Sequence, residues 1–167
     1  KKIFSDYLYN GGMPEMTHPD LTQEYKDERL YQYCLTYLQR DLRDIANIKD
    51  LNSFNIGQLI NFSTIAKIAS ITSVTAKKFL SYLEISYQTL TLQPWHKNLN
   101  KRLLKSPKVH FLDPGIQRAL LRRKSEINGH EYESAVIAEI YKQIKNHGLD
   151  VSLFHLRTLD DREIDLV

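Results

Sequence analysis

The middle of this 167-residue sequence carries basic and small polar side chains whose spacing suits contact with phosphate groups. In the stretch SVTAKKFLSYLE such residues fall on the side of a helix opposite its apolar residues: Ser73, Thr75, Lys77, Lys78 and Ser81. Between Trp95 and Lys108 the bases occur without an acid: Lys97, Lys101, Arg102, Lys105 and Lys108. Lysine and arginine neutralise phosphates, and small polar side chains on an outward helix reach phosphates and base edges. An ordinary solvated surface is the alternative to DNA binding, for which the candidates are Ser73, Thr75, Lys77, Lys78, Lys97, Lys101, Arg102 and Lys105.

Charge is distributed unevenly along the chain. Residues 1–50 hold 7 bases and 9 acids, residues 51–128 hold 12 and 3, and residues 129–167 hold 4 and 8. The net charge of +3 thus conceals a strongly basic middle between two acidic ends. A polyanionic partner is expected to bind the middle part.

The stretch STIAKIASITSVTAKKFLSYLE must position the first group of bases, and it is typical of two helices joined by a tight turn. We expect Ser63 to cap the first helix, and Thr72 or Ser73 to cap the second. The inner faces follow from helical spacing. In the first helix they are Ile65, Ala66 and Ala69, and in the second Ala76, Phe79, Leu80 and Leu83.

Two strands should follow this helix pair. QTLTLQPW alternates as a strand does, PKVHFLD is a second short strand, and the basic segment connects them. A helix-turn-helix followed by two strands and a basic loop is the order of a winged helix, which we predict from about Asn55 to Lys124. Trp95 is expected to anchor the core or the wing, with stacking on a base as the alternative. A further helix should start at Pro114.

The two flanking parts differ in character. The first, 1–54, is predicted to be helical, with a short helix ended by Gly11 and Gly12 and a longer apolar face that includes Leu30 and Cys34. The last, 129–167, reads as one amphipathic helix and two strands, DVSLFHLRT and REIDLV. The apolar spacing of that helix is Tyr132, Val136, Ile140 and Ile144. We thus predict a mainly α fold with short β, in three pieces: 1–54, 55–128 and 129–167.

Several classes of protein and site are disfavoured. No apolar run approaches the ~18 residues of a membrane span, and the first residues do not have the pattern of a secretory signal. The single cysteine, Cys34, cannot form an internal disulfide, so we expect a buried thiol and a cytoplasmic protein. The histidines show no metal-ligand spacing, and no Ser-His-Asp or Cys-His signature is present. The sequence ends within an apolar strand, so we expect it to be a fragment.

Several stretches together resemble a large prokaryotic family of predicted AAA+-type P-loop ATPases, in the region after the ATPase core. They are FSDYLYNGGMPE, RDLRDIANI, NFSTIAKIASITSVTAKKFLSYLE, PWHKNLNKRLLKSPKVHFLDPGIQRALL, GHEYESAVIAEI and FHLRTLDDREIDLV. They cover nearly the whole chain, and the run KRLLKSPK before a strand ending in Asp is the most specific. That family has further helical residues between the positions matching Phe54 and Asn55.

The resemblance implies an N-terminal core that uses ATP and Mg, a winged helix in the middle and a C-terminal part similar to restriction endonucleases. This chain contains no GxxxxGK[ST] motif, so we expect it to bind no cofactor and to hydrolyse no ATP. Whether the parent protein is an enzyme therefore depends on a core that this sequence does not include.

The resemblance also assigns roles to acids. Restriction-endonuclease-like nucleases use a helix glutamate, a strand aspartate and a following Glu-x-Lys, and the carboxylates hold a divalent metal. Glu133 and Asp165 match the first two positions, and Glu163 shares a strand face with Asp165. The Glu-x-Lys is absent, so we expect no complete metal site and no DNA cleavage. The alternative is that these acids only solvate a helix and a turn.

The leading hypothesis is therefore an accessory region that contacts DNA through its winged helix without catalysis. The alternative is a non-enzymatic module that docks a protein or couples the ATPase core to the C-terminal part, because winged helices serve both purposes. The expected partner is DNA or another protein, and not a membrane.

Overall fold

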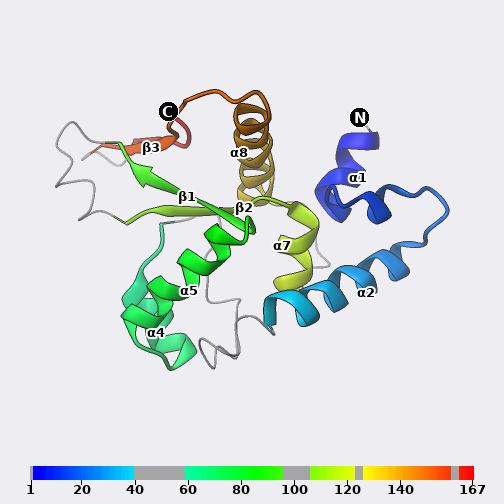
Figure 1. Cartoon of the computed structure of the whole chain (residues 1–167), viewed down its shortest axis with the longest axis horizontal. Coiled ribbons are helices and arrows are strands. Elements are labelled where there is room, and N and C mark those ends of the chain that lie inside the picture. Colours follow the sequence, from blue (N-terminus) through cyan, green and yellow to red (C-terminus); the bar gives the residue numbers. More distant parts are fainter. Residues whose placement is uncertain (1, 40–58, 96–105, 123–125, 159–161) are drawn as a thin grey trace.

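The computed structural model describes residues 2–39, 59–95, 106–122, 126–158 and 162–167. This part of the chain is mainly helical with a small sheet, as predicted (Figure 1). The helical elements are α1 (Lys2–Asn10), η1 (Pro14–Thr17), α2 (Gln23–Tyr33), η2 (Cys34–Gln39), α4 (Phe62–Ala69), α5 (Ser73–Ile85), α7 (Pro114–Leu120) and α8 (Gly129–Asn146). The strands are β1 (Thr89–Pro94), β2 (Lys108–Phe111), β3 (Phe154–Arg157) and β4 (Glu163–Ile164).

The helix pair α4–α5 has the predicted positions, with one correction at its start. Asn61 caps α4, and its side-chain oxygen accepts hydrogen bonds from the amides of Ser63 and Thr64 at 3.0 and 3.1 Å. Ser63 therefore lies inside the helix, because Asn61 reaches the first free N–H groups before it. Thr72 caps α5 as predicted and accepts from the amide of Thr75 at 3.0 Å.

The inner faces of α4 and α5 form much of the core. All the residues predicted to point inward are buried: Ile65, Ala66, Ala69, Ala76, Phe79, Leu80 and Leu83. Leu30 and Cys34 of the N-terminal part join the same core, which confirms that the Cys34 thiol is buried. None of the described helices has the length and apolarity needed to cross a membrane.

Strands β1 and β2 pair antiparallel, with Leu92 opposite Lys108 and Thr89 opposite Phe111. Leu59, just before α4, makes an isolated bridge to Lys108 on the other edge of β2. The order helix, helix, strand, strand is the one predicted for a winged helix. The strands predicted within QTLTLQPW and PKVHFLD are confirmed as β1 and β2.

The sheet extends beyond this pair. Its strand order in the described part is β2-β1-β3-β4, with β3 parallel to β1 and β4 antiparallel to β3. The segments predicted as separate pieces, 55–128 and 129–167, thus contribute strands to the same sheet, and α8 packs on β2. The three-piece division itself stays a prediction.

Helix α8 buries a different face from the one its large apolar residues suggest. Tyr132 and Ile140 are exposed, and Val136 is half-buried. The buried residues of α8 are Glu131, Ser134, Ala135, Ile137 and Ala138. Small side chains on this face let the helix approach β2 closely, and Glu131 is neutralised by Arg118 at 2.9 Å. The large apolar residues therefore predict the wrong face of α8. Close packing against β2 and the Glu131–Arg118 ion pair determine which face is buried.

Helices α1 and α7 meet end to end through glycines. Gly11 ends α1 with a φ of +75°, a conformation that glycine adopts without strain. Asp113 caps α7 by accepting from the amide of Ile116 at 3.0 Å, and its other carboxylate oxygen accepts from the amide of Gly12 at 2.8 Å. A Cβ on Gly115 would lie 2.4 Å from the carbonyl oxygen of Asn10.

Replacing Gly115 by alanine should lower the free energy of unfolding by about 2 kcal/mol. The added methyl group would clash with the backbone of Asn10, and relieving the clash would require helix α1 to shift. Urea denaturation measures this change. Gly129→Ala is the matched control, since Gly129 also lies in the first turn of a helix and has nothing within 4 Å of its Cβ position. Equal stability of the two variants would contradict the close approach of α1 and α7.

Candidate functional site

The outer face of α5 presents several of the predicted DNA-binding residues to solvent. Lys77 and Lys78 are exposed. Ser73 and Thr75 are half-buried, and the Thr75 hydroxyl lies 2.8 Å from that of the N-cap residue. The two lysines therefore form the accessible part of the predicted set on this helix, while Thr75 helps to fix the start of α5.

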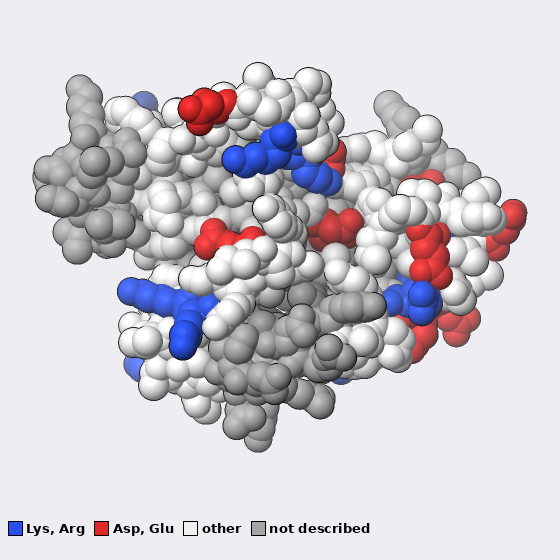
Figure 2. All heavy atoms as spheres, in the orientation of Figure 1, with Lys and Arg blue, Asp and Glu red and all other residues white. Residues whose placement is uncertain are grey.

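The helix pair is cationic on its outside. Its lysines are Lys67, Lys77 and Lys78, all exposed, and basic side chains gather over the α4–α5 region at the lower left of Figure 2. The one acid between Phe62 and Ile85 is Glu84, which is half-buried and accepts a hydrogen bond from the amide of Thr91 at 3.1 Å. The surface charge of the pair is thus positive and is not cancelled by its own acid.

The bases predicted for the wing lie outside the part of the chain that the structure describes. They are Lys97, Lys101, Arg102 and Lys105, within residues 96–105. Trp95, just before them, is partly exposed, and its backbone N–H donates to the carbonyl of His155 at 2.6 Å. Its backbone thus ties the end of β1 to β3.

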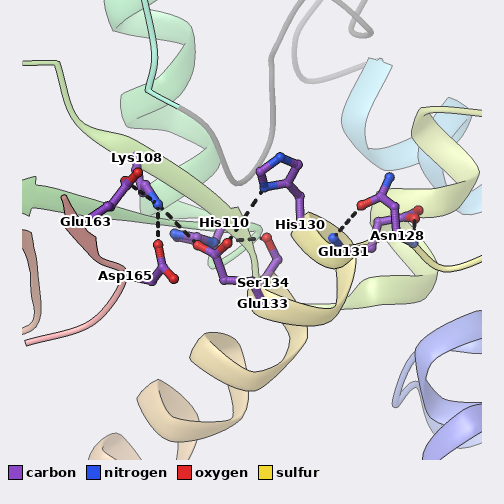
Figure 3. A network of polar contacts seen from close by, with 9 residues as sticks. All are labelled: Lys108, His110, Asn128, His130, Glu131, Glu133, Ser134, Glu163 and Asp165. Atoms are coloured by element: carbon purple, nitrogen blue, oxygen red, sulfur yellow. Dashed lines mark hydrogen bonds and ion pairs between the residues drawn. The ribbon is translucent and has the colours of Figure 1, made fainter. Parts of the chain in front are cut away.

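A second candidate site surrounds Lys108, the first residue of β2. Its Nζ lies 3.3 Å from Glu133 Oε1, 2.7 Å from Glu163 Oε1 and 2.8 Å from Asp165 Oδ1 (Figure 3). The lysine side chain is only 5% exposed, whereas that of Asp165 is 51% exposed. One buried ammonium group thus holds carboxylates from α8 and from β4 and its following residue.

Strand β2 carries Lys108, helix α8 carries Glu133, and strand β4 carries Glu163. Helix α8 begins with a capping box in which the Asn128 side chain and the Glu131 carboxylate each bind the other's backbone N–H at 2.9 Å, and this fixes the turn that carries Glu133. Glu163 and Asp165 both reach Lys108, so they share a face as predicted.

The pKa values in this cluster follow from burial and charge. Burial alone lowers the pKa of Lys108, but hydrogen bonds to Asp165 and Glu163 and the charge of Glu133 outweigh it, so the pKa is raised. Burial raises the pKa of Glu133, and the nearby charge of Lys108 opposes that rise only in part. Lys108 is therefore charged at neutral pH.

A divalent metal on Glu133 and Asp165, which the nuclease resemblance implies, does not fit this arrangement. The ammonium of Lys108 lies within hydrogen-bonding distance of the same oxygens and supplies the positive charge there. In the part of the chain that the structure describes, no three His, Cys, Asp or Glu side chains are grouped as a metal site requires.

Sequence reasoning found the acids but placed Lys108 wrongly. Counting it among the exposed bases of the connecting segment is a mistake, because the lysine is buried and ion-paired. The signals that could have indicated this are its place at the start of an apolar strand and the surplus of acids after residue 129.

Next to the cluster, His110 of β2 is fully buried, and its Nδ1 lies 3.0 Å from the Ser134 hydroxyl of α8. Burial, and then the charge of Lys108, lower the pKa of His110 to about 4. The ring is therefore neutral at pH 7, and it joins α8 to β2 beside the ion pairs.

One known protein family matches most of the chain. Residues 1–127 match the family described as Domain of unknown function (DUF8612). The chain belongs to the DUF8612 family. No curated protein and no solved structure matches it. The DUF8612 match includes α4, α5 and Lys108 and ends just before α8, so the three acids that bind Lys108 lie outside it.

Proposed function

We propose that this DUF8612 chain is an accessory region of an AAA+-type ATPase, acts in the cytoplasm, and contacts duplex DNA through the outer face of α5. It does so without catalysing a reaction itself. The observation that carries the proposal is that exposed Lys77 and Lys78 lie on α5 opposite its buried stripe, in a helix pair whose one acid binds the backbone of β1. Such a surface attracts phosphates.

The proposal predicts salt-dependent binding to a generic duplex that depends on these lysines. Each lost phosphate contact should reduce the slope of log affinity against log salt by about one unit, with little change in sequence preference. Lys77→Glu and Lys78→Glu should therefore weaken binding, as fluorescence anisotropy at several salt concentrations measures.

Lys145→Glu is the matched control, because Lys145 is also an exposed lysine on a helix, and the substitution changes the charge equally. The control should bind as the parent does. Equal, weak binding by the parent and all three variants would contradict the proposal.

A second candidate function is a non-enzymatic coupling module between the ATPase core and the C-terminal part. Two observations favour it: β1 pairs with β3, and Lys108 binds carboxylates from the C-terminal part. Movement of α8 or β4 would thus be transmitted to the hairpin that follows α5. Failure of DNA binding in the experiment above would leave coupling as the better account.

A further inference from the structure

The outer face of α5 carries exposed apolar side chains beside its lysines. Val74 and Ile85 are each 74% exposed. At ~100° per residue, Val74 lies about 180° around the helix from Leu83, which is in the core. Val74 is thus at the centre of the outward face in the first turn, and Lys77 and Lys78 follow one turn later on either side of it.

This arrangement suits a base edge better than a phosphate at the position of Val74. In helix-turn-helix proteins the N-terminal residues of the second helix approach base edges in the major groove. A valine neither donates nor accepts a hydrogen bond, and thymine is the base whose major-groove edge carries an apolar methyl group. The β-branched side chain also has one preferred rotamer in a helix, so it loses little freedom on contact.

We propose that Val74 contacts the C5-methyl group of thymine, so that the α5 face prefers A·T pairs, while Lys77 and Lys78 bind the flanking phosphates. This inference rests on the proposed DNA contact. The charge of the helix pair favours a polyanion over a protein partner, since Lys67, Lys77 and Lys78 are exposed and Glu84 is engaged with β1.

The test uses two duplexes of the same length. One consists of alternating A·T pairs, and the other has uracil in place of every thymine, which removes the methyl group and keeps the hydrogen-bonding pattern. Burial of one methyl group corresponds to about fourfold in affinity. The parent chain should therefore bind the uracil duplex about fourfold more weakly in fluorescence anisotropy.

Val74→Ser should abolish this difference and keep the salt slope that the lysines supply. Ile68→Ser is the control, because Ile68 is an exposed apolar residue of α4, and it should keep the difference. Both side chains are more than half exposed, so neither variant should change the melting temperature.

The outcomes separate the two proposals. Salt-dependent binding without discrimination between the duplexes overturns the thymine contact and leaves the DNA contact standing. Discrimination that persists in Val74→Ser places the methyl recognition elsewhere and overturns the role of Val74. No binding of either duplex by the parent contradicts the proposed function and, with it, this inference.

Discussion

Replacing Lys108 by methionine is expected to lower the free energy of unfolding at pH 7 by about 3 kcal/mol. Methionine keeps much of the apolar stem but removes the charge that compensates Glu133, Glu163 and Asp165. Removing one partner from a buried ion pair costs roughly 3–5 kcal/mol, and the partial exposure of the acids here favours the lower end. Urea denaturation of parent and variant measures the loss.

The pH dependence of this loss has a definite sign. The pKa of Lys108 is raised in the folded state, so its contribution is complete at pH 7 and is lost only as the pH rises through the folded-state value. In the variant the carboxylates repel one another, and their protonation removes this repulsion. The difference in free energy of unfolding between parent and variant should therefore shrink as the pH falls. Lys145→Met, at an exposed position, is the control. Unchanged stability of Lys108→Met at pH 7 would show that the ion pairs do not hold α8 and β4 to β2.

Acidification should destabilise the fold through His110. Its pKa is lowered in the folded state from 6.5 to about 4, by burial first and then by the charge of Lys108. A lowered pKa means that the contribution is present above pH 6.5 and is lost as the pH falls through 4. The difference corresponds to roughly 3 kcal/mol. The ring nitrogen Nε2 has no hydrogen-bond partner among the described residues, so a proton there would be poorly solvated.

Comparison with His110→Gln isolates this contribution, because the other groups titrate in both proteins. Between pH 7 and pH 4.5 the parent should lose more stability than the variant. His147→Gln, at an exposed position on the C-terminal end of α8, should follow the parent. Parallel curves for the parent and His110→Gln would mean that the histidine is not buried in its neutral form.

The helix pair and the hairpin could be predicted because their signals are local. In α5 the apolar residues recur at three- and four-residue steps and indicate the inner face of the helix. In β1 the alternation of Leu90 and Leu92 indicates a strand, but burial does not follow it, since Thr89 is buried and Leu90 is half-buried. The exposure of Lys77 and Lys78 follows from the helical spacing. Thr75 departs from it, since its hydroxyl lies beside that of Thr72 at the start of the helix.

The Lys108 cluster has no such periodic signal. Lys108 contacts Glu133 and Asp165, which lie 25 and 57 residues away along the chain. The pairing of β1 with β3, the pairing of β3 with β4 and the packing of α8 on β2 bring them together. Periodicity does not identify the buried face of α8 for a related reason. Ser134 and Ala138 are small, and they favour burial only because a partner strand packs closely against them.

The central claim, that duplex DNA binds the outer face of α5, is tested most directly by the acylation rates of individual lysines. A short duplex at low salt should slow the modification of Lys77 and Lys78 several-fold, and this protection should disappear at high salt. Lys145 on α8 should be modified at the same rate with and without DNA. Unchanged rates at Lys77 and Lys78 under conditions in which the duplex is bound would contradict the claim and place the DNA on another surface.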